Sequence, residues 1–206
     1  MERPLIRIVD DDAGLAKSFK LLLETMGWET VAYLDGPSFL ASDDLSRPGC
    51  IVLDVRMPGM TGIEVQDVLV QRGSTLPILF LSAHGSIPMA VSTVRKGAVD
   101  FLEKPIEPAD LLAKLSVAVT ESLEQHLAQQ QKAMRLERFR SLTPREHEVI
   151  GQMLAGNDAN KQIARLLDLE VSTVKMHWAN AFMKLGVHSS AELIRLAQEA
   201  GFDAKA

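Results

Sequence analysis

The stretch Cys50-Ile51-Val52-Leu53-Asp54 is a short apolar run that ends on a carboxylate. A second run, residues 5–9, is followed by the acidic cluster Asp10-Asp11-Asp12. Runs of four to eight apolar residues bounded by polar ones are typical of buried strands. Because open α/β sheets carry their chemistry at the carboxyl ends of the strands, we expect these carboxylates to lie on one edge of a parallel sheet.

Two more runs repeat this placement. Ser82 ends the run 78–81, and Lys104 comes shortly after the run 99–102. A fifth strand is expected at 29–33, and helical patterns begin near Gly14, Pro37, Gly62, Ser86 and Pro108. This alternation predicts an α/β domain, a doubly wound, five-stranded parallel sheet of the flavodoxin-like kind, over residues 1–120.

Composition limits the classes of protein that the chain can belong to. The 206 residues are 47% apolar, enough for two small cores, and the apolar runs are far shorter than the roughly 20 residues of a membrane helix. With no signal-like start, we expect a soluble, cytoplasmic protein that does not enter a membrane. Cys50 is the single cysteine, which excludes an internal disulfide, and its strand position predicts an unreactive buried thiol.

A helix without Gly or Pro is expected from Ala109 to about Arg140, so residues 121–140 form a helical linker. Apolar residues recur along it at intervals of three, four and seven, but Gln129-Gln130-Gln131 interrupts them. The linker is therefore either a solvated spacer or a dimerising helix.

Residues 141–206 predict an all-α domain of four short helices, at 144–155, 160–167, 171–185 and 190–200. Thr143 and Glu146 are spaced as a capping box, as are Ser189 and Glu192. The short turn 168–170 between two helices predicts a helix-turn-helix. This segment carries 7 Lys/Arg against 8 Asp/Glu, so DNA affinity must come from a local basic face rather than from net charge.

The acidic residues suggest a definite chemistry. Asp10, Asp11 and Asp54 together would make an all-oxygen site of the kind that Mg²⁺ prefers, with Mn²⁺ as a possible substitute. Lys104 would add a positive charge and Ser82 a hydroxyl donor, and attack of Asp54 on phosphorus would give an aspartyl phosphate. The alternative is that adjacent aspartates only cap the next helix.

The first domain closely resembles the CheY-like receiver domain of two-component response regulators, over residues 4–120. The segments Asp54-Val55-Arg56-Met57-Pro58-Gly59-Met60-Thr61-Gly62 and Gly97-Ala98-Val99-Asp100-Phe101-Leu102-Glu103-Lys104-Pro105 carry the likeness. The resemblance implies that Asp54 is the phospho-acceptor and that the Lys104–Pro105 bond is cis.

The same resemblance implies metal and switch roles for individual residues. Asp11 and Asp54 would bind the metal directly, Asp10 through water, and Arg56 through its main-chain carbonyl. Ser82 and Phe101 would be the switch residues, where the family more often has Thr and can have Tyr. Asp12 is more simply read as a helix cap.

The second domain resembles the LuxR-type DNA-binding domain of the NarL/FixJ class. Its motifs are residues 142–146, 160–164, 172–177 and 184–187. In the helix expected at 171–185, the residues outside the apolar stripe, and so the candidates to face the major groove, are Lys175, Met176, Ala179 and Asn180. The resemblance implies that Lys175, Met176 and Ala179 contact base edges or nearby phosphates. The residues expected to hold the DNA backbone are Lys161, Thr173, His177 and Lys184.

The combined expectation is a response regulator that takes phosphate from a sensor histidine kinase and binds promoter DNA. Phosphorylation is expected to promote a homodimer, RNA polymerase is a possible further partner, and catalysis is limited to the receiver's own phosphorylation and dephosphorylation. One rival is a metal-dependent aspartyl phosphatase, which generally needs a second acid where Arg56 stands. Another is a phosphorylation-dependent regulator whose helical domain contacts proteins and no longer binds DNA.

Overall fold

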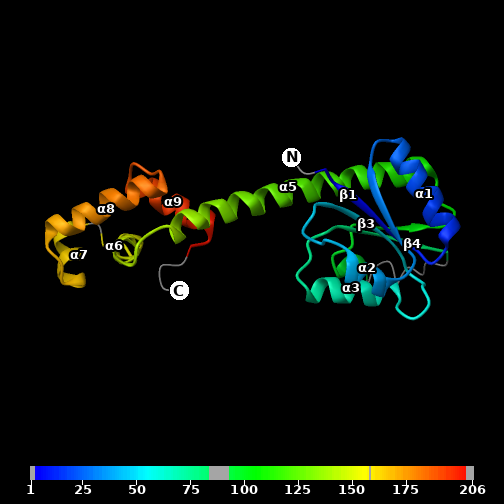
Figure 1. The fold of residues 1–206 in the computed structure, drawn as a ribbon, viewed down its shortest axis with the longest axis horizontal. Helices are drawn as coiled ribbons and strands as arrows, with labels where there is room; N and C mark the ends of the chain where they lie inside the picture. Colours follow the sequence, from blue (N-terminus) through cyan, green and yellow to red (C-terminus); the bar gives the residue numbers. More distant parts are fainter. Residues whose placement is uncertain (1–2, 84–92, 158, 203–206) are drawn as a thin grey trace. The chain divides into compact units, whose positions relative to one another are not determined.

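The computed structural model describes residues 3–83, 93–157 and 159–202. The chain divides into two compact units, Met1–His126 and Leu127–Ala206, each with its own hydrophobic core (Figure 1). No helix in the described ranges is both long and apolar enough to cross a bilayer.

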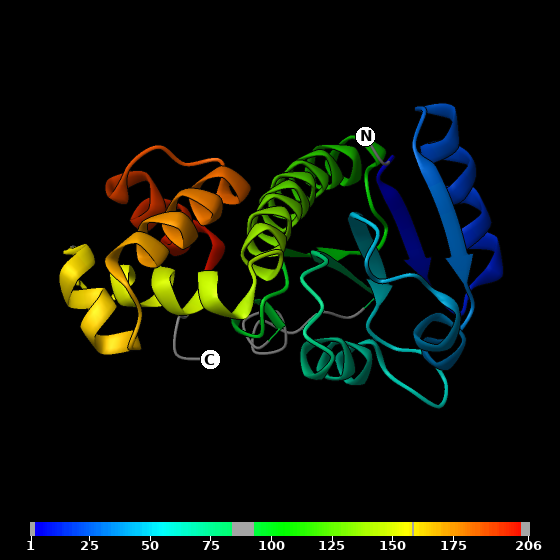
Figure 2. The same ribbon diagram turned by 60° about the vertical axis from the view of Figure 1, so that its left-hand side comes forward.

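The first unit contains a five-stranded, all-parallel sheet with the strand order β2-β1-β3-β4-β5. Figure 2 shows β1 and β2 side by side and pointing the same way. The order reverses direction at β1, as in a doubly wound sheet, which confirms the predicted fold class. The strands are β1 (Leu5–Val9), β2 (Glu29–Tyr33), β3 (Gly49–Asp54), β4 (Ile78–Ser82) and β5 (Asp100–Glu103).

Helices cover both faces of the sheet because the strand side chains alternate between two apolar clusters. Ile6 and Ile8 pack with α1 and α5, whereas Val9, Ile51 and Leu53 pack with α2 and α3. The helices are α1 (Ala13–Thr25), α2 (Gly36–Ser42), α3 (Gly62–Gln71) and α5 (Pro108–Arg140). The helix expected to begin near Ser86 falls outside the described residues.

The predicted long helix is present as α5, a single element of 33 residues. Its apolar stripe is exposed at Leu123, Leu127 and Met134. Its last turns belong to the second core, where Phe139 is 1% exposed and stacks on Phe202 with ring centroids 4.1 Å apart.

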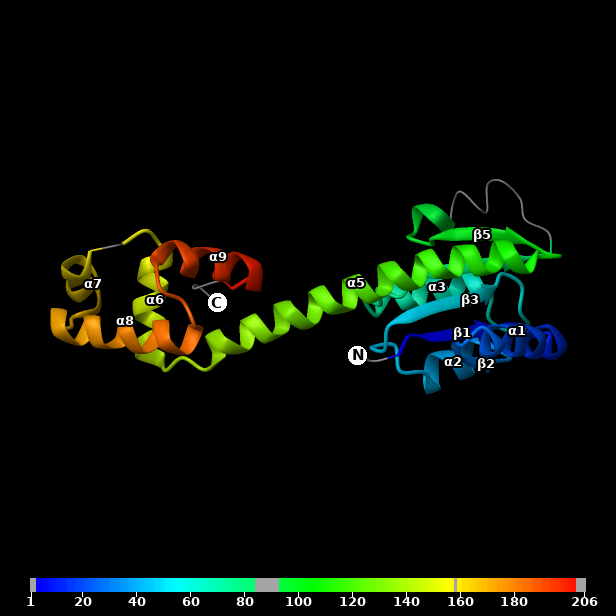
Figure 3. The ribbon, with the colours of Figure 1, turned by 90° about the horizontal axis from the view of Figure 1, so that it is seen from above.

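The second unit consists of helices packed around one apolar cluster (Figure 3). Thr143 and Glu146 form the predicted capping box. Ser189 forms only half of one, because the Glu192 carboxylate accepts from the His188 N–H instead. The helices are α6 (Pro144–Leu154), α7 (Asn160–Leu167), α8 (Val171–Leu185) and α9 (Ser190–Ala200).

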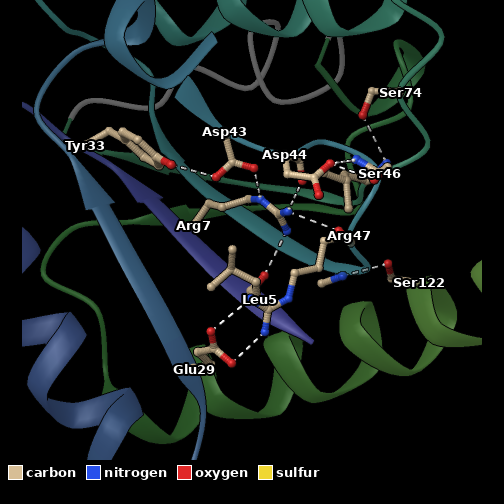
Figure 4. A network of polar contacts seen from close by, with 12 residues as sticks. Leu5, Arg7, Glu29, Tyr33, Asp43, Asp44, Ser46, Arg47, Ser74 and Ser122 are labelled. Atoms are coloured by element: carbon tan, nitrogen blue, oxygen red, sulfur yellow. Dashed lines mark hydrogen bonds and ion pairs between the residues drawn. The ribbon is translucent and has the colours of Figure 1, made fainter. Parts of the chain in front are cut away.

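A network of polar contacts surrounds Arg7 in the sheet (Figure 4). Arg7, in the middle of β1, is fully buried, and its Nε lies 2.6 Å from Asp43 Oδ1. The Tyr33 hydroxyl donates to Asp43 Oδ2 at 2.8 Å. The Arg7 guanidinium also donates to main-chain carbonyls of Leu5, Asp44 and Arg47. The network therefore ties β1 and β2 to the segment between α2 and β3.

Candidate functional site: an acidic pocket and a helix-turn-helix

The predicted reactive residues meet at the carboxyl edge of the sheet. Asp54 and Ser82 are the last residues of β3 and β4, and Asp10 and Lys104 directly follow β1 and β5. Since β1, β3, β4 and β5 are consecutive neighbours, these four side chains enclose one pocket of about 180 Å³. Its lining consists of Asp10, Asp11, Asp12, Asp54, Arg56, Ser82, Ala83 and Lys104.

Lys104 joins the two buried carboxylates. Its Nζ lies 2.6 Å from Asp10 Oδ2 and 2.6 Å from Asp54 Oδ1. The other Asp54 oxygen accepts the main-chain N–H of Arg56 at 2.7 Å. Asp54 is only 5% exposed, so little water reaches its carboxylate. The Lys104 ammonium at one oxygen and the Arg56 N–H at the other stabilise the charge instead.

Burial and charge pairing shift the pKa values of Asp10 and Lys104 in opposite directions. Burial raises the pKa of Asp10, and this outweighs the hydrogen bonds from Lys104 and from the Asp12 N–H. Burial alone would lower the pKa of Lys104, but hydrogen bonds to Asp10 and Asp54 raise it above its usual range. Lys104 therefore remains a cation at neutral pH and can neutralise an incoming anion.

The pocket suits a hydrated divalent cation better than a closed metal cage. Within the described ranges no three carboxylate, imidazole or thiol side chains converge closely enough to form a ready cage. Mg²⁺ usually takes one or two carboxylates and keeps several waters, and Asp11, which is exposed at the pocket wall, leaves room for them. The donor set therefore fits Mg²⁺. Asp12 is a helix cap, accepting from the N–H groups of Gly14 and Leu15.

The turn after β3 is held against the end of that strand by Gly62. Its N–H donates to Val55 O at 3.0 Å, and a Cβ at this position would lie 2.2 Å from the main-chain oxygen of Asp54. Only glycine allows α3 to begin so close to the strand that carries Asp54.

The two residues named as switches lie on adjacent strands. Ser82 is 1% exposed in the pocket, and the Lys104 N–H donates to its main-chain oxygen at 2.8 Å. Phe101 pairs with Phe80 in the β4–β5 register and is partly buried against the core on the α2/α3 side. The Lys104–Pro105 bond is cis, as expected.

In the second unit, α7 and α8 are separated by three residues, of which Asp168 adopts the left-handed conformation (φ 53°). Such a short turn is typical of the helix-turn-helix. On α8, Val174, Ala181 and Leu185 are fully buried, and Trp178 packs partly buried against the same core. The exposed predicted DNA contacts are Lys161, Lys175, Met176, Ala179, Asn180 and Lys184, and the half-buried ones are Thr173 and His177.

Lys184 already has a partner inside the unit. Its Nζ lies 2.7 Å from Glu146 Oε2, and the Glu146 side chain is 5% exposed. Burial raises the pKa of Glu146, but hydrogen bonds from Lys184 and Thr143 outweigh it and the net shift is downward. A DNA phosphate bound by Lys184 would therefore compete with Glu146 for the same ammonium group.

Comparison with known families agrees with both halves of this geometry. Residues 6–116 match the family described as "Response regulator receiver domain", and residues 140–197 match "Bacterial regulatory proteins, luxR family". The chain belongs to the response regulators with a LuxR-type output domain. It is therefore a two-component regulator of transcription, built from a receiver and a DNA-binding half, and its family is one of signalling proteins rather than classical enzymes.

Relatives match over nearly the whole chain. "Transcriptional regulatory protein FixJ" from Bradyrhizobium diazoefficiens is 37% identical over 95% of this chain and 95% of its own length. "Tetrathionate response regulatory protein TtrR" from Salmonella typhimurium is 38% identical over 92% of this chain and 90% of its own. The solved structure of response regulator StyR is 37% identical, covers 96% of this chain and 99% of its own, and superposes with a TM-score of 0.85.

Sequence reasoning missed three features of this regulator. Ala83 lines the pocket, which its place after Ser82 could have indicated. Met183 is 78% exposed on α8, and its seven-residue spacing from Met176 was the available signal. Arg7 interrupts an apolar strand, and that interruption was the only sign of its buried ion pair.

Proposed function

We propose that the receiver half accepts a phosphoryl group on Asp54 from a sensor histidine kinase. The observation that carries this is the position of Lys104 Nζ, 2.6 Å from both Asp54 Oδ1 and Asp10 Oδ2, in a pocket that also holds Ser82. An Asp54 oxygen attacks phosphorus, a new O–P bond forms, and the bond to the donor's leaving group breaks. The product is an aspartyl phosphate.

The pocket residues stabilise the charge that this transfer brings. Lys104 pairs with one phosphoryl oxygen, and the Ser82 hydroxyl donates to another. Asp11 and Asp54 would hold Mg²⁺ directly, with the main-chain carbonyl of Arg56, and Asp10 through water. Bound there, the ion would supply positive charge beside the phosphoryl oxygens, and Mn²⁺ could substitute for it.

Phosphorylation then changes the populations of two receiver conformations. Lys104 and Ser82 bind the phosphoryl group in only one of them, and that difference in contacts favours that conformation. We propose that Ser82 moves toward the phosphoryl group and that Phe101, on the neighbouring strand, follows it. The face around β5 then pairs with a second copy, and two α8 helices reach half-sites about one turn of DNA apart.

Labelling with acetyl phosphate and Mg²⁺ tests the acceptor assignment. The parent protein should form an acid-stable, hydroxylamine-sensitive adduct at one phosphate per chain, and Asp54→Ala should form none. Asp67→Asn is the matched control, because Asp67 is a carboxylate paired with a lysine on the surface of α3, away from the pocket. Labelling of Asp54→Ala at the parent's level would overturn the assignment.

The phosphatase alternative has no support from the pocket. The residue two positions after Asp54 is Arg56, whose main-chain N–H binds Asp54 and whose side chain is exposed. An aspartyl phosphatase generally has an acid there to protonate the leaving group. Sustained turnover of a small phosphate ester would contradict the receiver assignment, whereas labelling that stops at one phosphate per chain supports it.

A DNA-binding assay separates the proposed function from the alternative in which the helical half contacts only proteins. Full-length protein treated with beryllofluoride, a phosphoryl mimic, should bind selected DNA with an affinity that falls steeply as salt increases, because lysines release counterions from phosphates. Lys161 and Lys175 are exposed for such contacts. Sequence-independent binding that salt does not change would favour the protein-contact reading.

A further inference from the structure

The outward face of α8 has an unusual chemistry for a helix that enters DNA. The buried residues Val174, Ala181 and Leu185 define its inward side. At 3.6 residues per turn, the opposite side carries a ridge formed by Ser172, Met176, Ala179 and Met183, all of them exposed. Met176 is 52% exposed and Met183 78% exposed.

This ridge has little capacity for hydrogen bonding. Ser172 Oγ already donates to Glu170 Oε2 at 3.2 Å. Ala179 has no polar side-chain atom, and a methionine sulfur is only a weak acceptor. The exposed polar side chains, Lys175 and Asn180, flank the ridge on its two sides. The centre of the helix face therefore cannot read a base through the bidentate hydrogen bonds that Arg, Asn or Gln would make.

The major groove offers one apolar group to such a surface. Among the base edges only thymine presents a C5-methyl group there, and small or apolar side chains recognise it by contact. Met176 is the sixth residue of α8, within the N-terminal half that contacts bases in a helix-turn-helix. Ala179, one turn later on the same ridge, is small enough to leave room for a methyl group beside Met176.

Building on the DNA-binding role of this half, we propose that Met176 is a specificity-determining residue that selects thymine through its 5-methyl group, with Ala179 shaping the space. Sequence preference then comes from apolar contact at the centre of the helix, and Lys175 and Asn180 supply polar contacts at its edges. Met183 lies seven residues, about 10 Å, further along the axis and beyond the N-terminal half, and it takes no part in this contact.

Substituting uracil for thymine tests the proposal, because deoxyuridine differs from thymidine only by the methyl group. Preferred sites are first selected from random DNA with the full-length, beryllofluoride-treated protein. Each enriched thymine is then replaced singly by deoxyuridine, and Kd is measured by fluorescence anisotropy at fixed salt. At least one replacement per half-site should weaken binding about fourfold, as expected for one methyl group taken out of contact.

Variants assign the effect to a side chain. Met176→Ala should bind the thymine and uracil sites equally, and Met176→Leu, which keeps an apolar contact, should retain the penalty. Met183→Ala is the matched control, a methionine on the same ridge, and should keep the full fourfold difference. Both methionines are exposed, so neither change disturbs the core.

The possible failures can be told apart. Selective binding with no uracil penalty at any enriched thymine would overturn methyl recognition while leaving DNA binding intact. A penalty that persists in Met176→Ala, or that disappears in Met183→Ala, would overturn the assignment to Met176. Failure to enrich any sequence would refute both this inference and sequence-specific DNA binding by the second unit.

Discussion

Replacing Arg7 with methionine should severely destabilise the receiver half. Methionine has a similar length and fills apolar space, but it supplies none of the donors that Arg7 provides. Asp43, with a side chain 1% exposed, would keep the Tyr33 hydroxyl as its one side-chain donor among the described residues. The main-chain oxygens of Leu5, Asp44 and Arg47 would lose the guanidinium donors at 2.7–3.0 Å.

The size of the effect follows from this burial. Removing one partner of a buried ion pair costs about 3–5 kcal/mol, because the remaining charge is left without compensation. A small domain is stable by about 5–15 kcal/mol, so this change removes a large part of the total. Lys96→Met is the matched control: its ion pair with Asp67 has the same 2.6 Å separation, but the two side chains are 39% and 45% exposed. It should cost less than about 1 kcal/mol.

Urea unfolding followed by fluorescence measures the difference. The chain has two tryptophans, Trp28 in the first unit and Trp178 in the second. In a Trp178→Phe background the signal comes only from Trp28, which packs against the core shared by α1 and α5. The midpoint should fall strongly for Arg7→Met and little for Lys96→Met, at an unchanged slope.

A double-mutant cycle tests the reasoning behind this number. Asp43→Asn removes the stranded charge, so the pair Arg7→Met with Asp43→Asn should be less destabilised than the sum of the single changes by at least about 1 kcal/mol. Strict additivity, or a cost for Arg7→Met no larger than that of Lys96→Met, would show that the buried ion pair does not stabilise the receiver as argued.

Three further predictions follow from other contacts. Gly62→Ala should cut the rate of acetyl phosphate labelling at least about tenfold, because its Cβ would lie 2.2 Å from Asp54 O and displace the acceptor strand, a shift worth more than about 1.4 kcal/mol. Tyr33 should not ionise until about pH 12 in near-ultraviolet titration, because burial and then the hydrogen bond to Asp43 raise its pKa to about 12. The pKa of Glu146 is lowered in the folded state, so its contribution to stability is complete above its unfolded pKa and is lost as pH falls through the folded pKa. Glu146→Gln should therefore flatten the acid side of the pH–stability curve. The fluorescence of Trp178 in a Trp28→Phe background measures that curve.

Each of these predictions has an outcome that would contradict it, and the first has a control variant in the chain. Gly14→Ala meets only the flexible Asp12 side chain at 3.2 Å and should leave labelling unchanged, and equal labelling rates for both glycine variants would refute the close-approach argument. Tyr33 is the single tyrosine, so phenolate absorbance near pH 10 with native circular dichroism would contradict its burial. An acid limb that is identical in Glu146→Gln and the parent would mean that the ion pair with Lys184 contributes nothing.

The fold was predictable because its signals are local. Apolar runs that end on Asp54 and Ser82 gave the strands, and glycines after helices, such as Gly27 and Gly73, have the positive φ that a left-handed cap requires. The thiol of Cys50 is fully buried, as its strand position indicated, and burial raises its pKa to about 12. The strand runs and the glycine caps depend on residues that are close together in the sequence.

The ion pairs of Arg7 and Lys184 were not predictable, because they join residues that are far apart in the sequence. Arg7 and Asp43 are 36 residues apart, and Lys184 and Glu146 are 38 apart. Nothing in the local pattern distinguishes Lys184 from a solvated cation, and only its place inside an apolar strand sets Arg7 apart. The partner of each cation is determined by tertiary packing. The exposed ridge of α8 lies between these cases, because helical spacing placed Met176 outward and the same spacing extends to Met183, whose 78% exposure the packed domain shows.

The stacking of Phe139 on Phe202 has a consequence for how such regulators diversify by recombination. A gene fusion that attached this output half to a foreign receiver just after Arg140 would lack Phe139, which packs in the second core, and would lack the Arg135–Glu199 ion pair. The hybrid would present Phe202 to water and would be prone to aggregate. Viable crossovers therefore fall earlier in α5, before about residue 132, where the helix carries no side chains of the second core.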